Sequence, residues 1–111
     1  MKLTIQKVLF DALTACELIA EFVAGCNFAD YEKNAMLRSA VERQFEIVGE
    51  ALNQARYSDE TIVTLLPDLP RIVGLRNRLI HGYATINNQI IWSIVVDDIP
   101  VLTAQLQKLL T

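Results

Sequence analysis

Cysteine and histidine are scarce in this chain of 111 residues, which contains only Cys16, Cys26 and a single histidine, His81. Two cysteines are too few for a disulfide scaffold, and one histidine without a Cys-x-x-Cys pair gives no zinc-binding pattern. We therefore expect free, buried thiols in a reducing compartment, with no bound metal and no other cofactor.

Long, purely apolar runs are also missing, so we expect no membrane span. Near the N-terminus, Asp11, Glu17 and Glu21 interrupt every run that could serve as a secretory signal. Only four glycines and three prolines are present, which argues against a loop-rich fold. Together with the free thiols, these absences predict a cytoplasmic protein.

The chain has little basic charge, with ten Lys and Arg against 13 Asp and Glu and a net charge of −3. This balance excludes a generally basic nucleic-acid coating protein, so any nucleic-acid contact has to be local. Apolar residues make up 52% of the chain, enough for a real core. The length is that of one domain, spanning 1–111.

Apolar residues repeat at helical spacing, and no segment alternates with the period of a strand. The first helix is expected over about 3–24, where Gly25 stops it. Three apolar residues lie off its main stripe, which predicts a second neighbour or a partner chain: Phe10, Leu18 and Phe22. A second helix is expected from a cap at Asp30 to about Arg56.

The second half of the chain carries turn and cap signals. Ser58 is expected to cap a short helix that Pro67 ends, and Pro70 fits the first position of the next helix. Asn87 and Asn88 predict a turn before the last helix.

The last helix is expected over about 89–110 and contains Pro100. A proline inside a helix either kinks it or marks a restart, here with Asp97 or Asp98 as the cap. The fold expected from these segments is an all-α, up-and-down helical bundle.

Positive charge is concentrated in residues 69–96, which hold Arg71, Arg76 and Arg78 and no acidic residue. A local positive excess in an acidic chain predicts that something anionic docks there. On a helical wheel of this segment, Arg76 falls in the middle of the apolar side, while Asn77 and His81 share the opposite side at i, i+4 spacing.

A buried, unpaired guanidinium costs several kcal/mol, so Arg76 must meet a carboxylate, a partner chain or the mouth of a site. The nearest candidates by pattern are Glu46 and Glu50, which follow Glu42 in an acidic row on the second helix. Two interpretations stay open from the residues alone. Arg76 is either a structural ion-pair partner or a chemical group, and His81 either acts in chemistry or simply ends the helix.

The spacing Arg76-x4-His81-x-Tyr83 resembles the signature of HEPN-domain proteins, in particular the HepT-like toxins of prokaryotic toxin–antitoxin pairs. The similarity extends to residues 46–51 and 72–83, and to 91–92 followed by 97–100, in the same order along the chain. The compact N-terminal part and the short tail depart from that family, because they leave little room for accessory elements.

The resemblance implies a HEPN-like two-fold homodimer in which both motif helices line one cleft. It also implies a metal-independent endoribonuclease toxin of a type VII-like pair, with Arg76 and His81 as catalytic residues and Asn77 and Arg78 binding or orienting RNA. Tyr83 would be the residue that a cognate nucleotidyltransferase antitoxin modifies with AMP. Without such a role, Tyr83 is a core aromatic with its hydroxyl at the surface.

The residue types suit this chemistry, because histidine titrates near neutral pH and arginine binds phosphate through a rigid fork of donors. The alternative is a non-catalytic helical subunit that binds a substrate or partner for a nucleotidyltransferase. The joint presence of Arg76 and His81 favours the enzyme, since a pure binding subunit has no need of the histidine.

Overall fold

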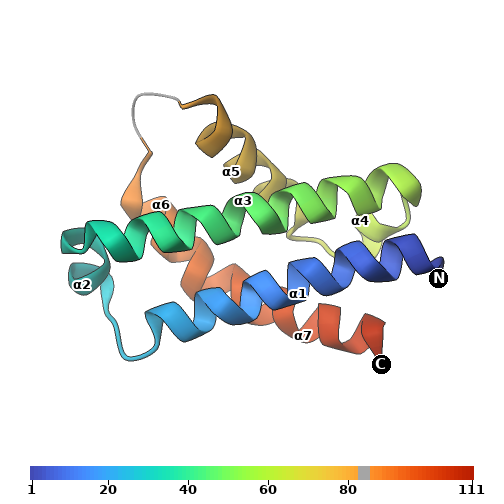
Figure 1. Ribbon diagram of the computed structural model, residues 1–111, viewed down its shortest axis with the longest axis horizontal. Helices are drawn as coiled ribbons and strands as arrows, with labels where there is room; N and C mark the ends of the chain where they lie inside the picture. The colour runs from blue at the N-terminus through green and yellow to red at the C-terminus, as the bar shows by residue number, and fades with distance from the viewer. Residues whose placement is uncertain (83–85) are drawn as a thin grey trace.

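The computed structural model describes residues 1–82 and 86–111, and helices are the only regular secondary structure in that part of the chain. In chain order the elements are α1 (Leu3–Val23), α2 (Phe28–Lys33), α3 (Ala35–Ser58), α4 (Ile62–Leu65), α5 (Leu69–His81), α6 (Asn88–Ser93), the π-helical turn η1 (Ile94–Asp98) and α7 (Ile99–Leu110). The expected all-α, up-and-down bundle is confirmed (Figure 1).

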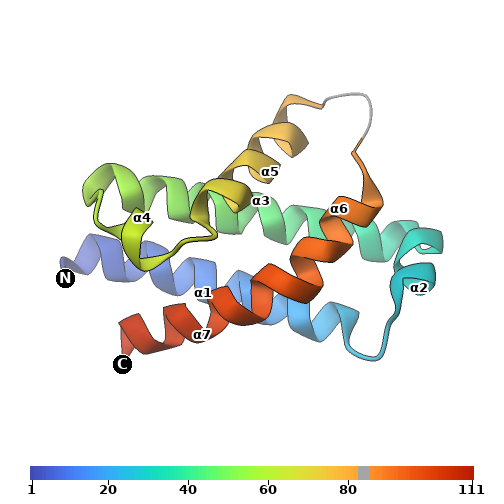
Figure 2. The ribbon, with the colours of Figure 1, turned by 180° about the vertical axis from the view of Figure 1, so that it is seen from behind.

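The long helices α1 and α3 lie side by side and run in opposite directions, and they form the centre of the bundle. Helix α5 packs on α3, whereas α7 packs on α1. Seen from behind in Figure 2, α6, η1 and α7 form one long helical segment that crosses the bundle. Helix α5, which carries the arginine and histidine motif, is therefore supported mainly by α3.

The core is formed by the predicted apolar stripes of the long helices. Fully buried side chains come from every long helix: Leu9, Ile19, Phe45, Leu52, Ile72 and Leu102. Burial of each such side chain stabilises the fold by about 1.5–3 kcal/mol before the cost of ordering. Among the three off-stripe residues of α1, Phe22 packs against this core, whereas Phe10 is 58% exposed.

The expected cap at Asp30 is wrong, because the chain forms two helices there. Asn27 caps the short helix α2 by accepting a hydrogen bond from the backbone N–H of Asp30, whose carboxylate accepts in return from the N–H of Asn27. Helix α3 then begins after Asn34, which accepts from the N–H of Leu37 at 3.0 Å. Either asparagine is a favoured cap residue, and the short helix between them hid the second boundary.

The expected cap at Ser58 is also wrong, because Ser58 is the last residue of α3. Asp59 organises the turn that follows. Its carboxylate accepts hydrogen bonds from the backbone N–H and the hydroxyl of Thr61, at 3.0 and 2.7 Å. These bonds to the charged form lower the pKa of Asp59.

Pro100 is accommodated without a break in the last helical segment. It lies in the first turn of α7, directly after the π-helical turn η1. In that turn the N–H of Ile99 bonds to the carbonyl of Ile94, five residues back. The wider turn accommodates the missing N–H and the ring of Pro100, so the helical segment continues through the proline. It also places Asp98 against α5.

The segment Asn88–Leu110 is long and apolar enough to cross a membrane by length and composition alone. In this fold one side of the segment belongs to the core, where its fully buried side chains include Ile91, Ile94 and Leu102. Core helices of soluble proteins pass the same test, so the segment is only weak evidence for a membrane span.

Both cysteines are free thiols, as expected from the sequence. Cys16 is buried in the core, and its burial raises its pKa to about 12. Cys26 follows α1 and is only half-buried. The two thiols therefore differ strongly in their access to solvent.

Candidate functional site

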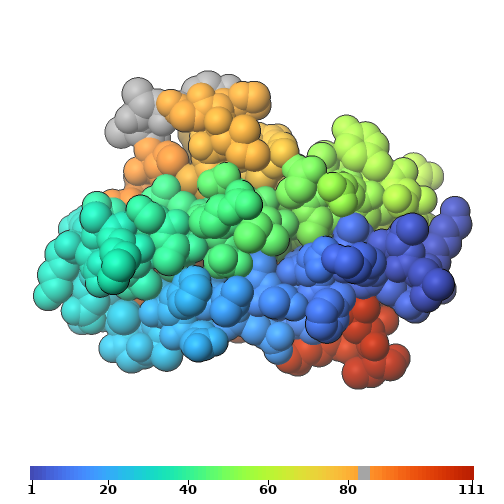
Figure 3. Space-filling model, viewed as in Figure 1, coloured from blue at the N-terminus to red at the C-terminus, as the bar shows by residue number. Residues whose placement is uncertain are grey.

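The motif helix α5 begins at Leu69, one residue before the start expected from Pro70, and ends at His81. Pro70 lies in its first turn, and Gly82 ends it in the left-handed conformation, with φ of 61°. Glycine adopts this conformation without the steric cost that a side chain adds. The C-terminal part of α5 projects beyond α3 at the surface of the molecule, as the orange atoms in Figure 3 show. His81 is therefore presented at an exposed helix end.

The stem of Arg76 lies flat against α3 at Gly49. A Cβ atom at Gly49 would overlap the Cβ of Arg76 and would stand 2.8 Å from its Cγ, closer than such atoms approach in proteins. The bare backbone of α3 thus makes room for an arginine at the α3–α5 contact. As a result the Arg76 side chain is only 22% exposed, and its Nε atom is buried without a hydrogen-bond partner among the described residues.

Four side chains form a continuous chain of hydrogen bonds through this arginine. Nη2 of Arg76 forms a close ion pair with Glu50, and Nη1 donates to Oδ1 of Asn77 at 2.9 Å. The second carboxylate oxygen of Glu50 accepts from Gln54 at 3.2 Å. The expected pairing of Arg76 with the acidic row is thereby confirmed at Glu50. Glu46 instead lies 3.6 Å from Arg43 of its own helix.

Asn77 and His81 lie on the exposed face of α5, whereas Arg76 faces α3. Five residues of helix separate Arg76 from His81 by roughly 140° around the axis and about 7.5 Å along it. One copy of the helix therefore does not direct both side chains at the same point. Asn77 stands between them and connects Arg76 to the exposed face.

The net positive charge around residues 69–96 is smaller than their sequence indicates. Two of the three arginines in this range form ion pairs with carboxylates that lie outside it. Arg71 donates to Asp98 of η1 at 2.8 Å and to the hydroxyl of Ser93 at 3.1 Å. Asp98 is 3% exposed, and its burial raises its pKa even though Arg71 opposes this shift. Among the described residues, Arg78 is the member of the trio without an ion-pair partner within 4.0 Å.

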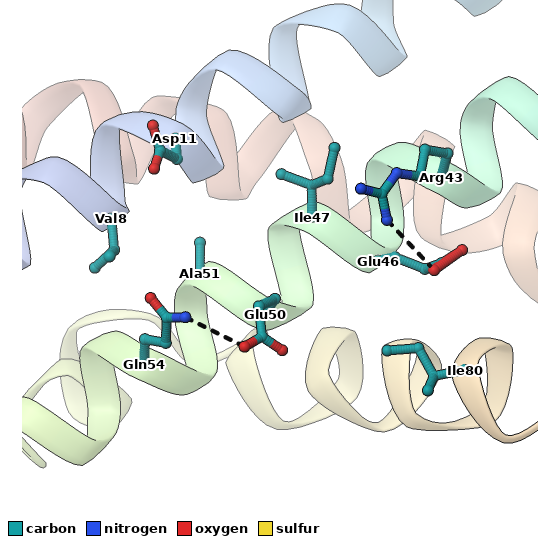
Figure 4. Close-up of a pocket in the computed structure, with 9 residues that line it drawn as sticks. All are labelled: Val8, Asp11, Arg43, Glu46, Ile47, Glu50, Ala51, Gln54 and Ile80. Carbon is teal, nitrogen blue, oxygen red and sulfur yellow. Dashed lines mark hydrogen bonds and ion pairs between the residues drawn. The ribbon is translucent and has the colours of Figure 1, made fainter.

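A cavity of about 300 Å³ opens beside Glu50, and its walls come from α1, α3 and α5 (Figure 4). The lining residues are Val8, Asp11, Arg43, Glu46, Ile47, Glu50, Ala51, Gln54 and Ile80. The wheel places Ile80 on the apolar side of α5, but the side chain borders this cavity and is 48% exposed. The carboxylates of Asp11, Glu46 and Glu50 make this cavity itself less attractive to phosphate than the surface on the other side of α5.

In the described part of the chain, no group of three or more His, Cys, Asp or Glu side chains is placed to hold a metal ion. By side-chain type, arginines such as Arg76 and Arg78 are able to bind phosphate, and a histidine such as His81 is able to transfer a proton. Tyr83, the expected modification site, lies outside the described residues.

Comparison with known proteins identifies similar chains that are named as ribonucleases. A protein of Methanocaldococcus jannaschii, provisionally named an RNase, is 33% identical over 96% of both chains. Another provisionally named RNase, from Caldanaerobacter subterraneus, is 35% identical over 88% of this chain and 87% of its own. A third, from Thermococcus cleftensis, is provisionally named ribonuclease HepT and is 32% identical over 98% of both chains. No solved structure matches significantly.

The description of the matching family is "Ribonuclease HepT-like", and the match spans residues 12–109. It includes α3 with Gly49 and Glu50, and all of α5. The chain therefore belongs to the HepT-like ribonuclease family.

Proposed function

We propose that this protein is a metal-independent endoribonuclease that acts as the toxin of a type VII-like toxin–antitoxin pair in the cytoplasm. Arg76 and His81 are its catalytic residues, and Asn77 and Arg78 bind and orient RNA. The observation that carries the proposal is the position of the Arg76 side chain, which Gly49 and Glu50 of α3 hold in place. Arg76 and His81 lie on the same helix, α5. An ordered guanidinium needs little rearrangement to stabilise a phosphate transition state.

In the proposed reaction the 2′-hydroxyl of RNA attacks the adjacent phosphorus. A neutral His81 side chain accepts the hydroxyl proton, the bond from phosphorus to the 5′-oxygen breaks, and that oxygen takes up a proton. The products are a 2′,3′-cyclic phosphate and a 5′-hydroxyl. Arg76 donates hydrogen bonds to the phosphate oxygens, where negative charge increases in the transition state.

A two-fold homodimer completes the proposed site. One histidine cannot easily act as base and acid in the same step, and a second copy supplies another His81 in the same cleft. The angular separation of Arg76 and His81 on α5 favours this arrangement, because the helix of a second copy can bring its own side chains to the same phosphate. Exposed Phe10 on α1 is available for contact between copies.

The proposal includes control by a cognate nucleotidyltransferase antitoxin through Tyr83, which the resemblance to HepT-like toxins implies and which lies two residues after His81 in the sequence. Transfer of AMP to the tyrosine hydroxyl adds bulk and negative charge near the proposed reaction centre. Such a group repels the RNA phosphate and competes for Arg76 and Arg78.

The test is cleavage of single-stranded RNA in EDTA by the parent chain and by Arg76→Ala and His81→Ala variants, with folding checked by circular dichroism. We expect losses of about 10²- to 10⁴-fold for His81→Ala and about 10²- to 10³-fold for Arg76→Ala. Lys108→Ala, at an exposed position of α7, is the control and should keep parental activity. A folded parent with unmodified Tyr83 that cleaves no RNA would favour the non-catalytic, partner-binding subunit.

A further inference from the structure

A second groove lies on the other side of α5, between that helix and the segment formed by α6 and η1. Its larger part has a volume of about 310 Å³, and its lining residues are Pro70, Arg71, Gly74, Leu75, Arg78, Ile90 and Ile94. A smaller hollow continues it toward Asn87, because the two share Leu75, Arg78 and Ile90. Among the described residues, the lining contains two arginines and no acidic residue, in contrast to the cavity beside Glu50.

Arg71 is held in place from below the groove. Its guanidinium donates to Asp98 and Ser93, which use two of its five N–H donors. Asp98 is buried, whereas the Arg71 side chain is 49% exposed, so the positive end of the pair faces outward. An arginine fixed in this way loses little freedom when it binds an anion.

Arg78 lies seven residues after Arg71, on nearly the same line along α5 and about 10 Å further on. It is exposed, and among the described residues no carboxylate lies within 4.0 Å of it. Gly74 stands between the two arginines, and a Cβ atom there would meet no other atom within 4 Å. The groove is thus open between two cationic side chains.

We propose that this groove binds the segment of single-stranded RNA next to the scissile phosphate. Arg71 and Arg78 contact successive parts of its backbone, and Leu75, Ile90 and Ile94 offer an apolar floor to sugars and bases. The groove adjoins the exposed face of α5 with Asn77 and His81, so a strand held there leads to the reaction centre. This assignment rests on the proposed ribonuclease function and adds Arg71 and Gly74 to its RNA-binding surface.

The test is a charge series at Gly74, where an added Cβ atom meets no atom of the described residues within 4 Å. Gly74→Lys, Gly74→Gln and Gly74→Glu place a positive, a neutral and a negative side chain of similar length between the arginines. Binding is measured by fluorescence anisotropy over a series of KCl concentrations. The probe is a 2′-O-methyl RNA oligonucleotide, which lacks the attacking hydroxyl and cannot be cleaved.

We expect affinity to fall in the order Lys, Gln, Glu, with at least about a tenfold difference between the first and the last at low salt. The slope of log affinity against log salt should be shallower by about 0.7 in an Arg78→Gln variant, which removes one phosphate contact. Arg78 has no ion-pair partner to lose among the described residues, so this substitution should leave the fold intact.

Equal affinities for the three Gly74 variants, together with an unchanged salt slope for Arg78→Gln, would overturn the proposal. The groove would then be open to an acidic protein surface instead. Because the probe is not cleavable, this result is separate from the catalytic claim. If the affinities follow the expected charge order but the chain cleaves no RNA, RNA binding in the groove is supported and the proposed ribonuclease activity is contradicted.

Discussion

Gly49 of α3 and Arg76 of α5 are in such close contact that the glycine cannot carry a side chain without moving the arginine. A Cβ atom at Gly49 would overlap the Cβ of Arg76, stand 2.8 Å from its Cγ and lie 3.3 Å from the carbonyl oxygen of Ile72. The partner atoms belong to the stem and backbone of a packed helix, so they have little freedom to shift. The position of α5, and with it that of Arg76, depends on the absence of one methyl group.

Gly49→Ala should therefore destabilise the fold by about 1–3 kcal/mol, as overpacking usually does. It should also reduce RNA cleavage, because α5 has to move away from α3. The control for stability is Gly74→Ala on α5, where the added methyl group meets no atom of the described residues within 4 Å and helix propensity favours alanine by about 0.5–1 kcal/mol. Urea denaturation gives both free energies of unfolding. Equal stabilities of the two variants would contradict the close contact at Gly49.

Glu50→Gln should separate RNA binding from catalysis. The substitution keeps the size of the side chain but removes the charge that holds Arg76. We expect RNA affinity to rise, because a negative charge beside the phosphate is gone. We expect kcat to fall by about ten- to a hundredfold, because Arg76 is no longer held in one position. Since the pair is partly exposed, stability should change by no more than about 1 kcal/mol.

Glu46→Gln is the matched control for Glu50→Gln, since Glu46 lies one turn away on α3 and pairs with Arg43. It should bring RNA affinity up slightly and leave kcat close to that of the parent. Parallel kinetics of both variants give kcat and KM. A fall of kcat by the same factor in both variants would show that general loss of acidic charge matters, and not the contact with Arg76.

The free energy of unfolding of an Asp98→Asn variant should increase relative to that of the parent as pH rises. Burial raises the pKa of Asp98, so the native state holds its proton more tightly than the unfolded chain does. The contribution of Asp98 to stability therefore falls as pH rises from about 3.9 through the raised native pKa, whereas asparagine does not titrate. Urea denaturation at about pH 4 and pH 7 measures the difference. If the parent gains stability over the variant along this interval, the pair with Arg71 outweighs burial.

The two thiols should react at very different rates with iodoacetamide in the native protein. Cys16 is buried and its pKa is raised to about 12, so almost no thiolate exists near pH 8. Cys26 is half-buried and should be alkylated first. Peptide mass analysis after timed labelling identifies the modified residue, and unfolding in urea should make both reactive. Modification of Cys16 at the rate of Cys26 would show that the core opens readily around α1.

The helices and their faces could be predicted because burial follows sequence periodicity. On α3, for example, the apolar stripe expected from helical spacing is buried at Val41, Phe45, Val48, Leu52 and Ala55, although its first member, Leu37, is only half-buried. The partner of Arg76 was found among only two candidates, Glu46 and Glu50. The predicted caps at Asp30 and Ser58 were wrong because other residues that favour cap positions lie close to each of them. The local sequence does not decide which of these residues forms the cap. Asn27, Asn34 and Asp59 take those roles.

Two features of the site could not be read from the sequence because they depend on contacts between distant segments. Arg71 looks unpaired within residues 69–96, but the π-helical turn brings Asp98 to it. Gly49 resembles an ordinary helix interior glycine until α5 is placed against it. The available signal was the presence of an isolated glycine inside a predicted helix, because such a glycine often marks close packing of another segment.

The most direct test of the central claim is identification of the RNA ends formed in EDTA by the purified chain and its His81→Ala variant. The account predicts 2′,3′-cyclic phosphate and 5′-hydroxyl ends from the parent, and no cleavage of the same RNA by the variant. Cleavage at the same rate by both chains, or products with 3′-hydroxyl and 5′-phosphate ends, would contradict a reaction in which the 2′-hydroxyl attacks with help from His81.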